Sequence, residues 1–328
     1  MKFKWVIKFL KRRFVMMVLG QGKRELLVLP ERGLKVLWIN RSAPSIGDAL
    51  MDLSGRELLR GHELHLFGYS NYANLFEGDR YFSNVYYELR QLFRVSKRIK
   101  FDAVILDSFA VRSVFVKFLV APGAPCVSMY GYLNGFEVHR TIYSFSRIAK
   151  LLNYRDCLEP RPFIELGSSV SPALSPGYVA IAIGAEWDFR NYRHWETVIR
   201  AMSAQGHQIV LIGSENGSKE AVRLQKLFPG VGNYVGKRSL KETATIIRGA
   251  AFILAADGGL WHIACALDKR SVGLFADCQL FDEKGIRTDR STDRCRSITL
   301  YGENFVSQIP PAEVIKAAQL LLERHKEP

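Results

Sequence analysis

Short apolar runs alternate with amphipathic stretches along most of this 328-residue chain. The apolar runs that predict strands in the first half are residues 35–40, 63–67, 102–106 and 125–129. Helical periodicity covers about 48–60, the stretch after residue 106, and 137–153. Strands alternating with helices predict an α/β domain around a parallel sheet.

The second half repeats this alternation. Its predicted strands are residues 178–183, 208–212, 233–235, 252–255 and 271–274, and a terminal helix is expected over 311–324. The prolines between 157 and 177 predict an interdomain linker. We therefore expect an N-terminal domain over 33–156, a C-terminal domain over 178–310 and a closing helix within 311–328. Ligands of such sheets bind beyond the carboxyl ends of the strands.

The first twenty residues predict a helix with one apolar side. That side carries Phe3, Ile7, Leu10, Phe14 and Met17, and a linker to about residue 33 should follow. Residues 1–24 hold eight Lys or Arg and no acid, within a chain of net charge +14. We expect this leader, residues 1–32, to bind an anionic membrane surface; a solvated or disordered tail is the alternative. No run approaches 18 apolar residues, so no membrane-spanning helix is predicted.

Composition and missing motifs exclude several functional classes. Hydrophobic content of 48% and charged content of 24% are typical of a globular protein. The five cysteines form no C-x-x-C, so neither a zinc site nor a disulfide framework is predicted, and a reducing compartment fits best. No G-x-G-x-x-G opens a helix, and no complete P-loop, G-x-S-x-G or D-x-D is present. Nucleic-acid binding rests on charge alone, and no such partner is expected.

The strongest candidate for chemistry is the turn that follows residues 251–255. It contains Asp257, Gly258 and Gly259, and His262 lies in the first turn of the predicted helix. Glycines let a ligand approach the backbone, and a helix start offers unpaired N–H groups to a diphosphate. The alternative is an ordinary strand–turn–helix corner with Asp257 as the helix cap.

Two further segments fit a phosphorylated ligand and its reaction. Gly184 follows a strand and precedes Arg190, which could pair with phosphate or simply be a solvated loop residue. Asp48 follows Gly47 after the first strand. It could cap the next helix or act as a general base, with Asp107 as the other acid at a strand end.

Together these segments resemble glycosyltransferase family 9, the ADP-heptose:lipopolysaccharide heptosyltransferase-like proteins. The resemblance covers about residues 34–325. It is carried by Ile46-Gly47-Asp48-Ala49-Leu50, Leu211-Ile212-Gly213-Ser214, Val235-Gly236-Lys237-Arg238-Ser239-Leu240, Asp257-Gly258-Gly259-Leu260-Trp261-His262-Ile263-Ala264 and Val272-Gly273-Leu274-Phe275. The resemblance implies a GT-B fold, in which two Rossmann-like domains face each other across a cleft. It also implies inverting transfer without a metal or another cofactor.

The resemblance assigns roles to residues by position. Asp48 matches the family's base, and Ser45 and Gly47 are expected on the acceptor side. The expected donor-binding residues are Gly184, Arg190, Gly213, Glu215, Asp257, Gly258, Gly259 and His262. The chain departs from the family where Arg190 replaces the usual lysine and where Asp-Gly-Gly replaces the commoner Asp-Ser/Thr-Gly.

The expected function is transfer of a sugar, with heptose the first candidate, from a nucleotide-diphosphate donor. The expected acceptor is a lipopolysaccharide core or a related glycan of a Gram-negative bacterium. The expected location is the cytoplasm, peripheral on the inner membrane. The rival hypothesis is a non-catalytic GT-B scaffold that binds a nucleotide or a glycan.

Overall fold

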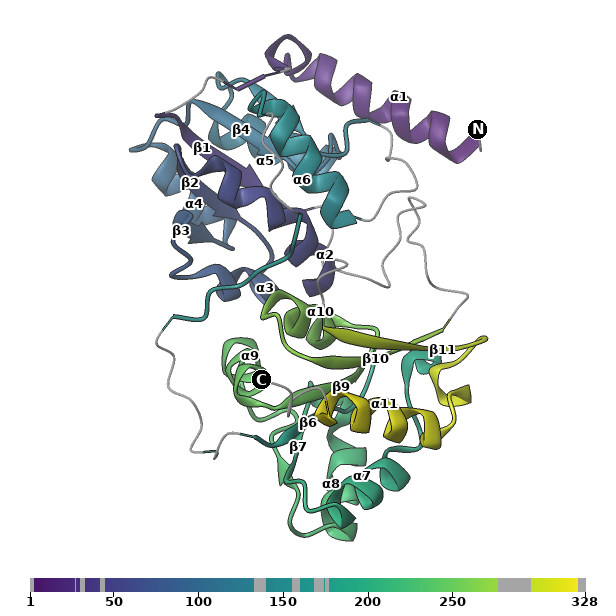
Figure 1. Ribbon diagram of the computed structural model, residues 1–328. Helices are drawn as coiled ribbons and strands as arrows, with labels where there is room; N and C mark the ends of the chain where they lie inside the picture. The colour runs from purple at the N-terminus through teal and green to yellow at the C-terminus, as the bar shows by residue number, and fades with distance from the viewer. Residues whose placement is uncertain are drawn as a thin grey trace. The chain divides into compact units, whose positions relative to one another are not determined.

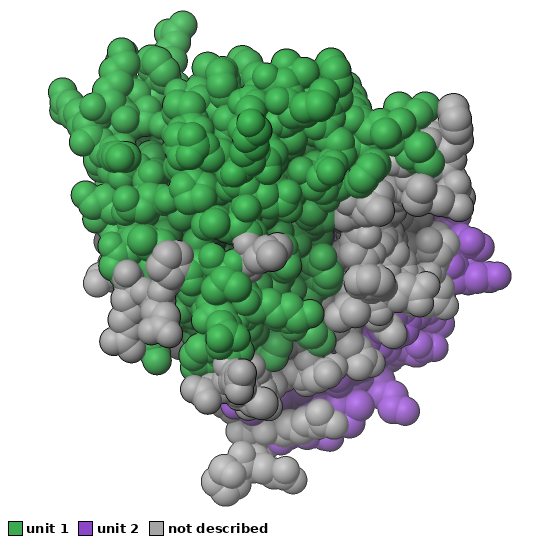
Figure 2. All heavy atoms as spheres, turned by 90° about the horizontal axis from the view of Figure 1, so that it is seen from above, with its two compact units in different colours: residues 1–167, 283–286 green, residues 168–282, 287–328 purple. Residues whose placement is uncertain are grey.

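The computed structural model describes residues 3–26, 28–29, 33–41, 45–132, 140–154, 160–167, 174, 177–276 and 296–323. Two parallel sheets organise these residues, one in each half of the chain (Figure 1). The chain divides into two compact units after residue 167, within the segment where prolines predict a linker (Figure 2).

The first unit is built on a five-stranded sheet. Its strands are β1 (Lys35–Ile39), β2 (Glu63–Phe67), β3 (Phe82–Tyr86), β4 (Ala103–Leu106) and β5 (Cys126–Ser128). Their order is β3-β2-β1-β4-β5, and every neighbouring pair is parallel. This is a Rossmann-type order, and it reverses direction between β1 and β4.

Helices connect these strands. They are α2 (Ile46–Asp52), α3 (Ser70–Ala73), α4 (Leu89–Ser96), α5 (Val111–Val120) and α6 (Arg140–Leu151). The predicted helix over 48–60 is only partly correct, because the 3₁₀ segment Leu53–Leu59 follows α2. A Cβ at Gly55 would lie 3.0 Å from Cγ1 of Ile148 on α6. The chain therefore carries glycine, a poor helix former, where α6 packs closely.

Helix α1 (Phe3–Val18) is docked on the first unit by one face. Met16 belongs to the core of this unit, Phe9 meets the ring of Tyr132 edge-on, and Arg12 donates to the Tyr132 carbonyl at 2.9 Å. The segment predicted as a linker is held too, since the Leu26 N–H donates to the Cys126 carbonyl at 2.8 Å. No helix in the described ranges is long and apolar enough to cross a membrane.

The second unit is built on a six-stranded sheet. Its strands are β6 (Val179–Ala182), β7 (Ile209–Ile212), β8 (Gly232–Asn233), β9 (Phe252–Ala256), β10 (Ser271–Ala276) and β11 (Ser297–Gly302). Their order is β11-β10-β9-β6-β7-β8, again parallel throughout. The order reverses between β6 and β9, which makes the carboxyl ends of these two strands the expected ligand site.

The helices of the second unit are α7 (Trp195–Ala204), α8 (Ser218–Leu227), α9 (Leu240–Gly249), α10 (Gly259–Ala266) and α11 (Pro311–Glu323). The terminal helix α11 packs against α7 and β10. Its Val314, Ala318 and Leu321 belong to the core that also contains Leu274 of β10. Helix α11 is therefore part of the second domain's core.

Two strands were not predicted from the sequence, β3 and β11. Each is the outermost strand of its sheet. Ser83 and Asn84 are exposed in the middle of β3, and most of β11 is only partly buried. Edge strands have less apolar surface to bury, so their sequences lack the continuous apolar run that marks the central strands.

Candidate functional site

The donor-site candidates of the second unit lie where β6 and β9 end. Gly184 comes two residues after β6, and Asp257 comes directly after β9. The two strands are neighbours and run parallel, so their carboxyl ends meet at the same edge of the sheet. The sequence-predicted residues therefore lie at the point where the strand order reverses, as the fold predicts for a ligand site.

Arg190, Asp257 and His262 come together at this edge. Nη2 of Arg190 lies 3.0 Å from Oδ2 of Asp257, and Nε2 of His262 lies 3.8 Å from Oδ1 of the same carboxylate. The side chain of Asp257 is 7% exposed and that of Arg190 is 28% exposed. Nε of Arg190 is buried and has no hydrogen-bond partner in the described part of the chain. The arginine is therefore ordered by its ion pair with Asp257, and the exposed part of its guanidinium can reach a ligand.

No described side chain caps the start of α10. Its N-cap is Gly258, which has no side chain to bond the first turn, so Asp257 does not cap this helix. The first bond within the helix is that of the His262 N–H to the Gly258 carbonyl. The N–H groups of the preceding turn have no partner inside the helix, and the helix dipole favours negative charge there.

A second group of predicted donor residues surrounds the ends of β6, β7 and β8. Gly184 and Gly213 have φ angles of +86° and +156°, in the region that favours glycine. A Cβ at Gly184 would lie 2.7 Å from the Gly217 nitrogen, and one at Gly213 would overlap the Ile183 carbonyl oxygen. These glycines let the strand ends touch through their backbones. The Glu215 carboxylate lies over the backbone of Gly236.

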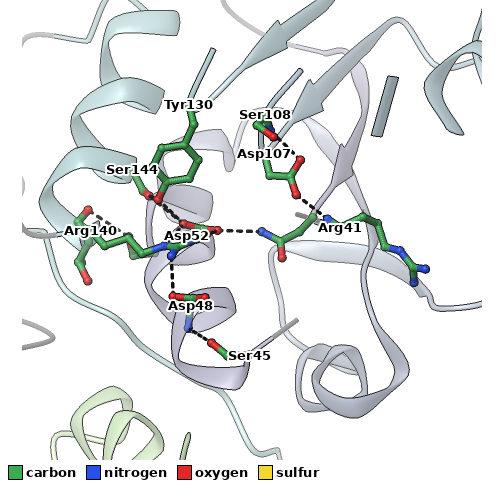
Figure 3. A network of polar contacts seen from close by, with 12 residues as sticks. Arg41, Ser45, Asp48, Asp52, Asp107, Ser108, Tyr130, Arg140 and Ser144 are labelled. Atoms are coloured by element: carbon green, nitrogen blue, oxygen red, sulfur yellow. Dashed lines mark hydrogen bonds and ion pairs between the residues drawn. The ribbon is translucent and has the colours of Figure 1, made fainter. Parts of the chain in front are cut away.

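In the first unit, the predicted base Asp48 lies in the first turn of α2. Ser45 is the N-cap of this helix, and its Oγ accepts the Asp48 N–H at 3.1 Å. Because Ser45 performs the capping, the carboxylate of Asp48 does not have to. It is 25% exposed, and its Oδ1 accepts from Nη1 of Arg140 at 2.5 Å (Figure 3). Gly47 is buried inside α2.

Asp107, the other candidate acid, is buried and held by hydrogen bonds within the first unit. It is 1% exposed. Its Oδ2 accepts the Arg41 N–H at 2.6 Å, and its Oδ1 accepts the Ser108 N–H at 2.6 Å and the Ser113 hydroxyl at 3.0 Å. A buried carboxylate with several donors is held in place and poorly exposed to a substrate hydroxyl. Asp48 is thus the better candidate base of the two.

Sequence reasoning missed the buried partners of Asp48. Asp52 and Arg140 form a bidentate pair, with Nε–Oδ1 at 2.8 Å and Nη2–Oδ2 at 2.9 Å. Burial tends to lower the pKa of Arg140, but Asp52 and the other nearby acids outweigh it and raise this pKa well above its ordinary value. The four-residue spacing of Asp48 and Asp52 on one helix face was a signal for the acid pair. Nothing local in the sequence points to Arg140.

No group of three or more His, Cys, Asp or Glu side chains could hold a metal ion within the described ranges. The candidate donor residues of the second unit include the guanidinium of Arg190 and the backbone N–H groups at the start of α10. Such groups can stabilise a leaving diphosphate electrostatically.

The chain is similar in fold to known glycosyltransferases. A glycosyl transferase family 9 structure from Veillonella parvula DSM 2008 has a TM-score of 0.74 and 13% identity, covering 91% of this chain and 100% of that one. E. coli heptosyltransferase WaaC with ADP has a TM-score of 0.69 and 19% identity, covering 88% of this chain and 100% of that one. E. coli ADP-heptose lps heptosyltransferase II has a TM-score of 0.70 and 15% identity, covering 89% of this chain and 100% of that one. The dodecameric iron-containing heptosyltransferase TibC is less similar, with a TM-score of 0.51 and 15% identity, covering 92% of this chain and 78% of that one.

No curated protein matches the chain in sequence. The model of glycosyltransferase family 9 (heptosyltransferase) matches residues 160–284, which include Arg190, Asp257 and His262. This match and the GT-B fold confirm the predicted resemblance and support glycosyltransferase activity. The chain therefore resembles glycosyltransferase family 9 over residues 160–284 and has a fold of two parallel-sheet, Rossmann-like units.

Proposed function

We propose that this protein is an inverting, metal-independent glycosyltransferase that uses a nucleotide-diphosphate sugar. Asp48 takes the proton of an acceptor hydroxyl while the oxygen of that hydroxyl attacks the anomeric carbon of the donor sugar. The bond from that carbon to the diphosphate oxygen breaks, and the nucleoside diphosphate leaves with the electron pair. The proton stays on Asp48 until solvent removes it.

The observation that carries the proposal is the group formed by Arg190, Asp257 and His262 beside the uncapped start of α10. Charge develops on the diphosphate as its bond to the sugar breaks. Fixed N–H donors and a guanidinium that is already held in place stabilise that charge with little reorganisation. Asp257 holds Arg190 through Nη2, and the side chain of Arg190 is still 28% exposed for contact with a phosphate oxygen.

The similar structures support a finer assignment of both substrates. Their names describe heptosyltransferases, one in complex with ADP and one named as an ADP-heptose lps heptosyltransferase. ADP-heptose is therefore the first donor to test, and a lipopolysaccharide core is the first acceptor. The first unit offers two cations to an acidic acceptor. The guanidinium carbon of Arg41 lies 3.9 Å from the ring centre of Tyr69, and that of Arg112 lies 5.9 Å from the same ring.

Mutual repulsion of these two cations fits an anionic ligand. Burial and the nearby Arg112 lower the pKa of Arg41, partly offset by nearby acidic groups. A phosphate or carboxylate bound between the two guanidiniums would relieve the repulsion, and Arg is well suited to either anion. This arrangement favours an acidic acceptor over a neutral glycan.

The test is product formation from ADP-, UDP-, GDP- and CMP-linked sugars with a lipopolysaccharide-core acceptor, with and without EDTA. We expect a glycosylated acceptor with ADP-heptose, inverted at the anomeric carbon, at an unchanged rate in EDTA. Retained anomeric configuration, or loss of activity in EDTA restored by a metal, would contradict the proposed mechanism. Donor binding without product for every pair would favour the non-catalytic scaffold.

We further propose that α1 holds the protein on the cytoplasmic face of the inner membrane, against anionic lipid. One face of α1 is docked on the first unit, and the other carries side chains that are 51–69% exposed: Ile7, Leu10, Phe14, Met17 and Val18. The cations Lys8, Lys11 and Arg13 are also exposed on this helix, whereas Arg12 is buried. A fixed apolar stripe flanked by cations suits the interface of an anionic bilayer.

Vesicle binding tests this surface. Phe14 is 60% exposed, and burying a whole Phe side chain contributes about 1.5–3 kcal/mol. Phe14→Ser should therefore weaken binding to phosphatidylglycerol vesicles by roughly 5–20-fold. The matched control is Phe93→Ser on α4, an exposed Phe away from the stripe that should leave binding unchanged. Equal effects of the two substitutions would refute this role of α1.

A further inference from the structure

Three charged side chains form a compact group at the contact of α2 with α6. Figure 3 shows Asp48 and Asp52, one helical turn apart on α2, with Arg140 reaching both from the start of α6. Asp52 and Arg140 are almost fully buried, whereas Asp48 is 25% exposed. The group thus runs from the interior to the surface, and the predicted base is its outer member.

Asp52 fixes the guanidinium of Arg140. Its two oxygens accept Nε at 2.8 Å and Nη2 at 2.9 Å, so they determine the plane of the guanidinium. Asp52 is held in turn by the Tyr130 hydroxyl at 2.5 Å and by Nδ2 of Asn40 at 3.3 Å. With its plane fixed, Arg140 directs its remaining nitrogen, Nη1, at Oδ1 of Asp48.

This geometry leaves the two oxygens of Asp48 in different environments. Oδ1 is bonded to Arg140 at 2.5 Å. Oδ2 makes no hydrogen bond to the described residues, and the side chain reaches the surface. A carboxylate anchored through one oxygen presents the other in a fixed direction, as a general base requires.

The charges of Arg140 and Asp52 also affect how readily a neighbouring carboxylate accepts a proton. A carboxylate beside an arginine alone is a weak proton acceptor, because the cation stabilises its charged form. Here the second carboxylate, Asp52, offsets the arginine, so the group of three carries one net negative charge. Among the described residues, Tyr72 on α3 and Tyr130 after β5 are titratable groups beside it, and both are neutral because burial raises the pKa of their hydroxyls.

We propose that Arg140 and Asp52 are positioning residues for the reaction: Arg140 orients Asp48, and Asp52 orients Arg140 and balances its charge. This inference rests on the proposed function, in which Asp48 is the base. The competing explanation is that the buried pair only joins α2 to α6. A joining role predicts changes in stability, whereas a positioning role also predicts changes in the pH dependence of turnover.

The experiment measures kcat against pH for the full-length protein and its variants. Arg140→Gln removes the cation and leaves two carboxylates facing each other, so the acidic limb of the kcat profile should move up by about 1–3 pH units. Adding Asp52→Asn removes the second negative charge, and the limb should move back toward that of the wild type. An unmoved limb in Arg140→Gln, or no return in the double variant, would overturn the proposal.

Two further variants complete the design. Asp52→Asn alone keeps Arg140 but leaves its charge unbalanced, so kcat should fall at neutral pH without an upward shift of the limb. If Arg140→Gln does not fold, an upward shift in Asp52→Asn still overturns the proposal. Asp48→Asn is measured in parallel. Wild-type turnover in that variant would refute the base itself, whereas an inactive Asp48→Asn beside an unmoved limb in Arg140→Gln would refute only the positioning role.

Discussion

Arg190 offers the sharpest test of the donor site. It gives one nitrogen to Asp257 at 3.0 Å and keeps a buried Nε without a hydrogen-bond partner among the described residues. In the proposed function Arg190 donates a charged hydrogen bond to the diphosphate, and such a bond typically contributes about 1.5–3 kcal/mol, which Arg190→Ala would remove. The substitution also leaves the nearly buried Asp257 carboxylate facing an anionic ligand. We therefore expect donor kcat/KM to fall by at least roughly 10–150-fold.

The assay is donor kcat/KM at saturating acceptor, with a second arginine as the control. Arg193 lies three residues further on, is 65% exposed and pairs with the equally exposed Asp188. Exposed pairs contribute about 0–1 kcal/mol, so Arg193→Ala should change donor kinetics by no more than about fivefold. Arg190→Lys should recover part of the loss, because it keeps the charge but lacks the planar fork. Equal kinetics for Arg190→Ala and Arg193→Ala would refute the assignment.

Three other predictions concern acceptor binding, local backbone and pH. Arg41→Ala should raise the acceptor KM about tenfold and leave the donor KM unchanged, measured with the acidic core acceptor. Gly213→Ala should lower the melting temperature and weaken donor binding, because a Cβ there overlaps a backbone oxygen at a φ of +156°. Burial lowers the pKa of His65 below 6.5, so the folded state resists protonation, and stability should fall as the pH drops below about 6.5. His65→Gln should flatten that fall in a series of melting curves; an unchanged slope would contradict the assignment.

The central strands could be predicted because they are buried on both faces. The last four residues of β1 and all four of β4 are buried and apolar, and such runs are visible in the sequence. The outermost strands β3 and β11 could not be predicted, because their polar positions interrupt the pattern. The helix after β1 was expected as one element, but its second half is a 3₁₀ segment that includes Gly55.

The candidate sites also differ in how much of each could be predicted from the sequence. The turn from Asp257 to His262 is contiguous, so it could be identified as a candidate site from the sequence alone. Arg140 lies 92 positions from Asp48, and only the packing of α6 on α2 brings them together. Helix α1 was predicted with its exposed stripe. The docked face was missed because it includes Arg12, a cation that is buried by bonding a carbonyl oxygen.

The turnover of Asp48→Asn tests the central claim most directly. Asparagine keeps the size of the side chain and cannot accept the hydroxyl proton, and Ser45 still caps α2. A positioned general base contributes about 10²–10⁴-fold. With ADP-heptose and the core acceptor, we predict that kcat falls by at least about a hundredfold while donor binding stays at its wild-type value. Near wild-type kcat in this variant would contradict the account.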